Sequence, residues 1–155
     1  MKNSLTISKG ARAWVAVVSR AHVERGAAGG FIQVCHGKRA PLERMQPGDW
    51  IAYYSPTTEF RGGEPLRAFT AIGRVLSEAT YPFDMGGGFV PFRKDVAYAT
   101  GTHAAQIHPL LPRLHFAQRT PNWGMLARRG HFEIDPHDLT VIATAMGCAL
   151  KTARS

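Results

Sequence analysis

The chain has 155 residues, of which 45% are hydrophobic and 19% are charged, the size and balance of one globular domain. No apolar run reaches the roughly 20 residues of a membrane span, and the N-terminus lacks the apolar core of a secretory signal, so we expect a cytoplasmic protein. The formal net charge is +8, and such an excess favours a polyanionic partner such as nucleic acid.

The first predicted elements follow a loose, polar tail over residues 1–11, and a single domain is expected over 12–150. A buried strand is predicted over 13–19, because its residues are almost all apolar. Ser19 is a good helix N-cap, so a short helix is predicted over 20–25. The domain is therefore expected to begin as a strand followed directly by a helix.

The segment from Gly48 to Pro56 is the most informative part of the chain, because a turn leads directly into an aromatic strand, predicted over 49–55. The loop over 56–65 carries Arg61 and is expected to be mobile. Gly73, inside the strand that follows this loop, suggests a bulge or a tight barrel bend. Further strands are predicted over 31–35, 66–77, 89–98 and 131–134, and helices over 41–45 and from Asp135 or Asp138 to Ala149, before a frayed tail over 151–155.

These elements amount to about six strands, several short helices and one longer C-terminal helix. Long, irregular connections between the strands do not fit a doubly wound α/β sheet. We therefore predict an α+β fold in which a small mixed β-barrel of about six strands is flanked by peripheral helices.

Five sequence blocks occur in an order that resembles the EVE domain family, which belongs to the PUA-like group together with YTH and ASCH domains. The blocks are Trp14–Arg20, Gly48–Ser55, Phe69–Val75, Pro91–Arg93 and Gly130–Ile134. The resemblance implies a PUA-like β-barrel that binds its ligand without catalysis and without a cofactor. EVE domains look like readers of modified bases in DNA, some relatives act on RNA, and YTH relatives hold a methylated adenine in an aromatic cage. The resemblance does not imply which base is bound.

Aromatic and small polar side chains are the candidates for binding a modified, flipped base. Trp50 and Tyr54 are four residues apart on one strand and so share a face, while Trp123 lies in a segment without periodicity. Stacking of a base on such a ring contributes about 1–3 kcal/mol; the alternative is that the rings only fill the core. The predicted base-binding residues are Ser19, Arg20, Trp50, Tyr54, Ser55, Phe92, Asn122 and Trp123.

Cationic side chains around this slot are expected to hold the nucleic-acid backbone. In His36-Gly37-Lys38, the glycine would let a phosphate approach the main chain, although an exposed turn explains the same tripeptide equally well. Any single arginine can also be an ordinary solvated group. The predicted backbone contacts are Lys38, Arg61, Arg93, Arg128, Arg129 and His131.

Two other functions stay open. An ASCH-like enzyme that hydrolyses RNA or a modified nucleoside could use Lys38, Tyr54 and Glu24 or Glu133. However, the acidic residues are dispersed, and neither a serine elbow nor a phosphate-binding glycine loop is present. The third possibility is a plain interaction domain with a vestigial pocket. The seven histidines and two cysteines show no metal-ligand spacing, so no metal site is expected, and we expect a monomer.

Overall fold

A curled, half-barrel sheet forms the centre of the protein in a computed structural model, which describes residues 4–152. Along its main path the strand order is β3-β7-β5-β4-β2-β9, and the short strands β6 and β8 pair with β7 and β5. Strands β2 and β4 run parallel, whereas the other neighbours in this sheet are antiparallel. The strands are β2 (Ala13–Val17), β3 (Phe31–Ile32), β4 (Trp50–Thr57), β5 (Pro65–Val75), β6 (Tyr81–Pro82), β7 (Phe92–Tyr98), β8 (Ala105–Gln106) and β9 (His131–Ile134).

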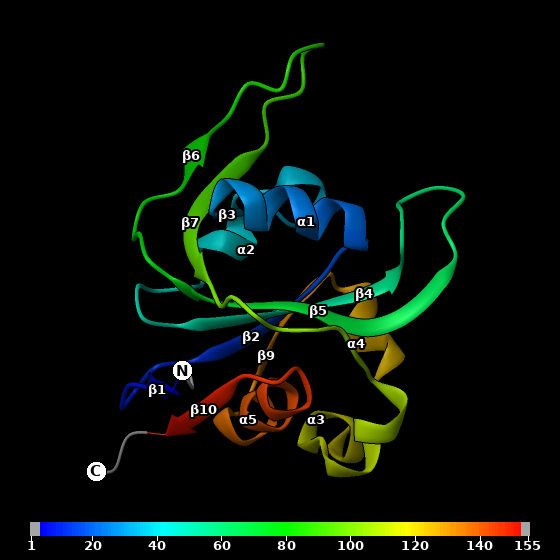
Figure 1. The fold of residues 1–155 in the computed structure, drawn as a ribbon. Coiled ribbons are helices and arrows are strands. Elements are labelled where there is room, and N and C mark those ends of the chain that lie inside the picture. Colours follow the sequence, from blue (N-terminus) through cyan, green and yellow to red (C-terminus); the bar gives the residue numbers. More distant parts are fainter. Residues whose placement is uncertain (1–3, 153–155) are drawn as a thin grey trace.

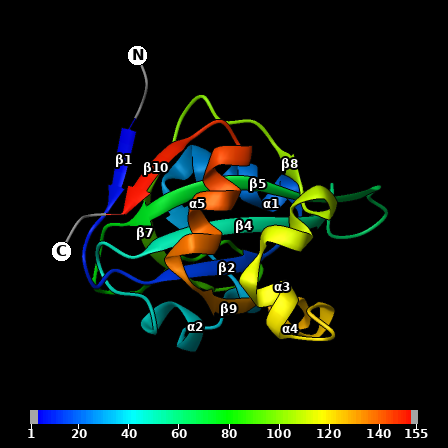
Figure 2. The same ribbon diagram turned by 90° about the horizontal axis from the view of Figure 1, so that it is seen from below.

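Helices cover both faces of this sheet, as Figure 1 shows, with α1 and α2 on one side and α3 and α5 on the other. Seen from below, α5 lies across β5, β4 and β2 (Figure 2). The helices are α1 (Arg20–Gly29), α2 (Ala40–Glu43), α3 (His115–Arg119), α4 (Gly124–Arg128) and α5 (Pro136–Ala145), with 3-10 turns η1 (Cys35–Gly37) and η2 (His108–Arg113). The predicted mixed fold with about six barrel-like strands and peripheral helices is confirmed.

Strand β4 explains why the core has two halves. Alternate residues of a strand point to opposite faces, so Trp50 and Tyr54 belong to the hydrophobic cluster under α5, whereas Ile51 and Tyr53 belong to the cluster under α1. All four side chains are buried. The aromatic strand is therefore a central strand that is covered on both sides.

The two ends of the described chain pair with each other, where the sequence predicted a loose tail over 1–11 and fraying after 150. Strand β1 (Ser4–Ile7) runs parallel to β10 (Ala149–Thr152) in a separate two-stranded sheet. Ile7 and Leu150 are both buried, so the pairing brings apolar side chains from the chain ends into the core. Residues 1–3 and 153–155 lie outside the described residues.

Helix α1 begins as predicted and ends later. The Ser19 side chain accepts a hydrogen bond from the His22 amide, which confirms the predicted cap, but the helix continues through Gly26 to a left-handed Gly30. A Cβ atom on Gly26 would lie 2.8 Å from the Phe31 carbonyl oxygen. This glycine therefore allows close packing of the helix rather than ending it.

Strand β5 also differs from the prediction of a bulge at Gly73. The shifts in pairing lie elsewhere, between Tyr53 and Tyr54 and between Ser55 and Thr57 of β4. A Cβ atom on Gly73 would lie 2.6 Å from a methyl group of Val96, so glycine is needed there because β7 passes so close. Among residues 4–152, no helix combines the length and apolarity needed to cross a lipid bilayer.

Candidate nucleic-acid interface

The predicted aromatic slot is not assembled in the structure. Trp50 and Tyr54 are only 2% and 6% exposed and belong to the cluster under α5, whereas Phe92 packs against the cluster on the opposite face. The sheet therefore separates Phe92 from Trp50 and Tyr54, and the buried rings of these two residues offer no exposed face to a base. Ser55 is also buried, and its hydroxyl lies 2.7 Å from that of Thr70 on the neighbouring strand.

Tyr54 and Trp123 do come together. Their rings meet edge to face, with centroids 5.8 Å apart, and Trp123 meets Phe116 in the same way at 6.2 Å. Trp123 is half-buried and stands directly before α4, beside the exposed Asn122. Burial raises the pKa of Tyr54. The Trp123 ring is thus held mainly as packing at the rim of the core, with its edge contacts worth about 0.5–1.5 kcal/mol each.

Arg93 is buried, which corrects its predicted role as a phosphate contact. Its guanidinium lies between the rings of Phe31 and Phe83, 3.7 and 3.8 Å from their centroids, and donates to the Gln33 side chain at 3.0 Å. Desolvation lowers the pKa of Arg93. Because rings cover both faces of the guanidinium and Gln33 binds its Nε, this side chain fastens β3 and the β6–β7 hairpin to each other.

His131 is buried as well and is not available to a phosphate. Its ring stacks on Trp14 with centroids 4.9 Å apart and an angle of 9° between the planes. Neither ring nitrogen has a hydrogen-bond partner among the described residues. Burial, with a smaller effect from Arg44, lowers the pKa of His131 to about 4, so the ring is neutral near pH 7.

A turn with an unusual backbone lies near the beginning of α1. Cys35, His36 and Gly37 all have positive φ angles, of 49°, 59° and 82°. Holding a residue other than glycine in this region costs on the order of 1–3 kcal/mol and persists only where the surroundings enforce it. Such strain is concentrated at binding and catalytic sites, so this turn is a candidate for function.

The surroundings of the turn enforce this conformation. A Cβ atom on Gly37 would lie 2.4 Å from Pro91, so only glycine fits against the residue that precedes β7. The Cys35 thiol donates to the carbonyl oxygen of Arg129, at the end of α4, over 3.5 Å. The turn is therefore fixed between two segments that are distant in the sequence.

The loop between β4 and β5 reaches the same place. Phe60 is 71% exposed, and its ring meets that of His36 edge to face at 5.9 Å. The loop is tied to the first turn of α1, because the Ala21 amide donates to the Thr58 carbonyl at 2.9 Å. We call the surface made by Cys35–Gly37, the 58–64 loop and the start of α1 the turn–loop face.

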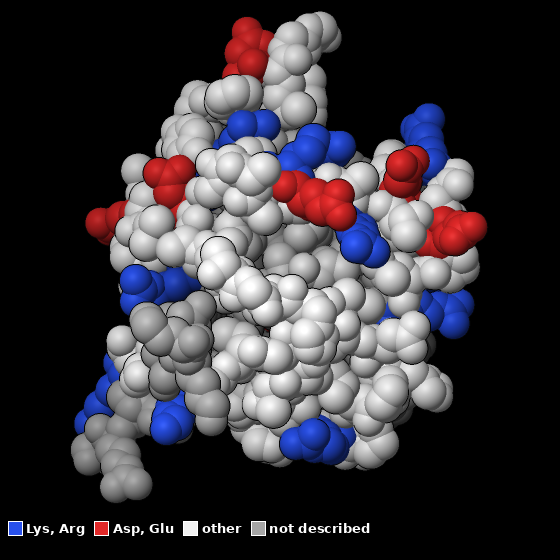
Figure 3. Space-filling view, in the orientation of Figure 1, with Lys and Arg blue, Asp and Glu red and all other residues white. Residues whose placement is uncertain are grey.

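Several cations that lie near the turn–loop face, or that were predicted to contact the nucleic-acid backbone, have no carboxylate partner. Lys38 and Arg44 act electrostatically on Cys35, and the Arg61 guanidinium lies 5.6 Å from the Phe60 ring centroid. Among residues 4–152, none of the exposed cations of this group forms an ion pair; they are Lys38, Arg44, Arg61, Arg128 and Arg129. By contrast, Arg20 is paired with Glu24 at 3.1 Å. On the face seen in Figure 3, cations and carboxylates are interspersed.

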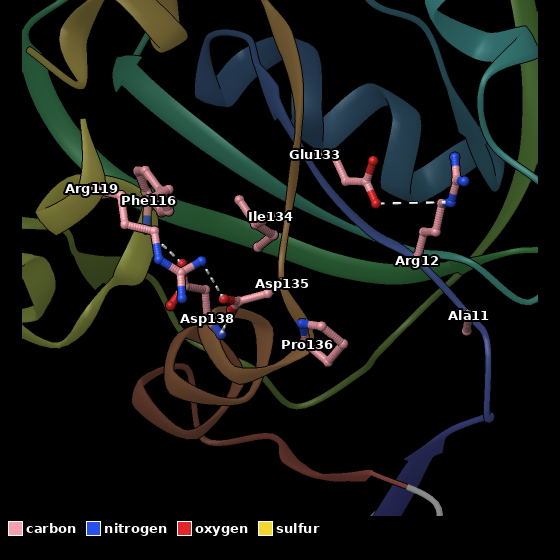
Figure 4. A pocket seen from close by; sticks show the side chains of 9 residues that line it. All are labelled: Ala11, Arg12, Phe116, Arg119, Glu133, Ile134, Asp135, Pro136 and Asp138. Atoms are coloured by element: carbon pink, nitrogen blue, oxygen red, sulfur yellow. Dashed lines mark hydrogen bonds and ion pairs between the residues drawn. The ribbon is translucent and has the colours of Figure 1, made fainter.

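A hollow with a volume of about 410 Å³ lies elsewhere, between β9, α3 and α5 (Figure 4). Its walls carry both signs of charge, and Phe116 is the one aromatic residue in the lining. None of the predicted base-binding residues lines it. The lining residues are Ala11, Arg12, Phe116, Arg119, Glu133, Ile134, Asp135, Pro136 and Asp138.

Sequence reasoning missed Phe60 and Cys35. The signal for Phe60 was present, since a large apolar ring between Glu59 and Arg61 in a glycine-bearing loop has little chance of being buried. Cys35 gave no comparable signal, because its role depends on a backbone conformation and on a contact with Arg129, 94 residues away.

Comparisons with known proteins place the chain in one family. The chain is 49% identical over 134 residues to the UPF0310 protein YdcG of Bacillus subtilis, covering 86% of this chain and 91% of that protein. It is 54% identical over 136 residues to the UPF0310 protein msl3206 of Mesorhizobium japonicum, with the same coverage.

Solved structures share the fold at low sequence identity. Rpa0253 from Rhodopseudomonas palustris superposes with a TM-score of 0.53 at 16% identity, covering 88% of this chain and 93% of that one. Atu2648 from Agrobacterium tumefaciens gives the same TM-score at 14% identity, covering 90% and 95%. The model of the EVE domain family matches residues 12–145, and with the close relatives this shows that the chain belongs to the EVE domain family.

Proposed function

We propose that this protein binds DNA or RNA that carries a modified base, and that the turn–loop face receives the base. The observation that carries the proposal is the exposed ring of Phe60, which lies against His36 on a strained turn and is bordered by unpaired cations. Because the Phe60 ring is 71% exposed on the 58–64 loop, it is accessible to a ligand.

The chemistry of the face suits a flat base on a charged backbone. A base stacked on Phe60 or His36 would gain about 1–3 kcal/mol, which offsets the few kcal/mol needed to flip it from a duplex. Lys38, Arg44 and Arg61 would neutralise the flanking phosphates, so affinity should fall steeply as salt increases. Membership of the EVE domain family supports a ligand-binding role, and the resemblance to YTH relatives supports an aromatic contact with the base.

The test is a titration of the purified protein with short fluorescent oligonucleotides, DNA and RNA, each with one modified base, at two salt concentrations. Phe60→Ala is expected to weaken the preferred ligand by about 5- to 150-fold, the equivalent of one stacking contact. Leu76→Ala removes a comparably exposed apolar side chain elsewhere and should change nothing. Wild-type affinity of Phe60→Ala for every oligonucleotide would refute the proposed base contact.

The position of the phosphates is tested separately by charge. Arg44→Gln and Arg113→Gln each remove one exposed positive charge, from the turn–loop face and from η2. Only Arg44→Gln should lower the affinity for the oligonucleotide, and it should reduce the slope of log affinity against log salt concentration by about one. Equal losses in the two variants would mean diffuse attraction rather than a site.

We further propose that binding occurs without turnover. An ASCH-like hydrolase was expected to need Tyr54, Lys38 and an acid, yet Tyr54 lies in the core with a raised pKa. Glu133 lies on β9, 3.8 Å from Arg12 at the hollow. Incubation with single-stranded RNA and with acetylated cytidine should leave both intact, and products that disappear in Lys38→Ala would overturn this proposal.

A further inference from the structure

Two histidines and two aspartates meet where α3 and α5 begin. One ring nitrogen of His115 and of His137 and one carboxylate oxygen of Asp135 and of Asp138 all lie within 4.8 Å of one another. The His115 Nδ1 is 2.8 Å from Asp135, and the His137 Nδ1 is 3.0 Å from Asp138. The two imidazoles stack with centroids 3.9 Å apart and planes 7° apart.

We propose that these four residues form a binding site for a divalent first-row transition metal, with zinc as the best-suited ion. Imidazole nitrogen and carboxylate oxygen are donors that zinc accepts, and four such donors complete a tetrahedral site. Two carboxylates and two neutral imidazoles also balance the charge of the ion. The site is independent of the turn–loop face and of nucleic-acid binding.

The spacing of the donors is close to what the ion requires. Donor atoms on one tetrahedral zinc lie about 3.3 Å apart, given bonds of about 2 Å. The pairs at 2.8 and 3.0 Å need to open by no more than about 0.5 Å, and the longest distance of 4.8 Å must close by about 1.5 Å. Rotation of the half-exposed His137 ring can provide such a change.

The carboxylates are held in place by the backbone. Asp138 is fully buried and accepts the amides of His115 and Phe116 at 2.7 and 3.0 Å, while Asp135 caps α5 by accepting the Asp138 amide at 3.0 Å. Outer contacts of this kind orient metal ligands in known sites. The oxygens are therefore fixed before any ion arrives.

The guanidinium of Arg119 lies beside two of the four residues. Arg119 donates to Asp135 at 3.2 Å, and its other terminal nitrogen lies 3.4 Å from the His115 Nδ1. Its side chain is 69% exposed and borders the hollow seen in Figure 4, where Asp135 and Asp138 point toward the same space. Arg119 can therefore swing into solvent and leave its two partner atoms to a metal.

The stacked rings must part before an ion binds. A ring nitrogen directs its lone pair in the plane of its ring, so two parallel imidazoles 3.9 Å apart cannot both point at one ion, and the half-exposed His137 ring must rotate. The site would then join α3 to the β9–α5 corner as a structural staple, because a ligand that binds only the native state stabilises it.

The experiment uses the full chain after treatment with a chelator, titrated with Co²⁺ followed by absorption and with Zn²⁺ followed by calorimetry. We expect one ion per chain, with His115→Ala and His137→Ala each weakening binding by at least about tenfold. His108→Ala removes an exposed histidine of η2 and should bind as the wild type does. A Zn²⁺ concentration 100-fold above Kd should raise Tm by roughly 5–10 °C.

Arg119→Gln tests the direction of the effect. Because it removes the competing cation, it should tighten Zn²⁺ binding while the fold is retained. The proposal is overturned if no saturable binding is seen. It is equally overturned if His115→Ala and His137→Ala, folded by circular dichroism, bind as tightly as wild type, or if His108→Ala loses as much affinity as they do.

Discussion

The buried imidazole of His131 should make the stability of the protein depend on pH in a way that one substitution removes. Its folded pKa of about 4 lies below the usual 6.5, because burial disfavours the charged ring. The unfolded chain therefore binds more protons than the native one between these values. This contribution of His131 to the free energy of unfolding is fully present above about pH 6.5, decreases as the pH falls, and is lost below about pH 4.

The magnitude follows from the same two values. The two pKa values correspond to roughly 3 kcal/mol in total, most of which, roughly 2–3 kcal/mol, lies between about pH 7 and pH 4.5. His131→Phe keeps a ring stacked on Trp14 and removes both unpartnered nitrogens. Between about pH 7 and pH 4.5, the free energy of unfolding of the variant should therefore fall by roughly 2–3 kcal/mol less than that of wild type, whatever its value at pH 7.

The assay is urea unfolding followed by circular dichroism at several pH values between 4.5 and 7. Other groups titrate here too, for example His22, whose pKa is lowered chiefly by burial, but they cancel when the two proteins are subtracted. His108→Phe, a substitution at an exposed histidine, is the control, and its free energy of unfolding should depend on pH as that of wild type does. If the free energy of unfolding of His131→Phe showed the same pH dependence as wild type, the reasoning about a neutral buried ring would be refuted.

Four further substitutions test how the fold is stabilised. Lys94 is buried and donates to two carbonyls at the end of α2 at 2.9 and 2.6 Å, so Lys94→Ala should destabilise by about 2–4 kcal/mol in urea unfolding. Asp49→Ala should lower the free energy of unfolding by about 2–4 kcal/mol in the same assay, because the Asp49 carboxylate accepts N–H groups from Arg12, Trp14 and Gln46. An unchanged urea midpoint would contradict this. Gly73→Ala should lower the stability by about 1–3 kcal/mol through overpacking against β7. The matched variant is Gly48→Ala, whose Cβ would meet no atom within 4 Å. Because Gly48 has a positive φ, any loss of stability there should come from backbone strain alone.

The local parts of the fold could be predicted because local patterns decide them. Apolar runs specified β2, β4, β5 and β9, and Ser19 marked the start of α1. Of the two candidates for the start of α5, Asp135 and Asp138, the structure selects Asp135. The pairing of β1 with β10 could not be predicted in this way, since each strand is short and is stabilised only by a partner more than 140 residues away. Tertiary contact, rather than propensity, decides such strands.

The candidate site was predicted less well, for a physical reason. Alternation placed Trp50 and Tyr54 on one face of a strand, but it does not tell whether that face is open, and here α5 covers it. The rings that are exposed depend on loops and on a backbone turn that no periodicity reports. The four possible metal ligands escaped for a similar reason, because His115 and Asp135 are 20 residues apart and meet only through the folded chain.

The position of Arg93 between Phe31 and Phe83 has a consequence for how this protein can be engineered. The sandwich anchors the base of the β6–β7 hairpin. At its tip, a Cβ atom on Gly86, Gly87 or Gly88 would meet nothing within 4 Å, and Figure 1 shows this hairpin extending away from the body of the protein. A foreign peptide, such as an epitope or a fluorophore attachment sequence, inserted at the tip would meet no obstacle and would disturb no buried contact. The tip is therefore the natural place to attach a reporter.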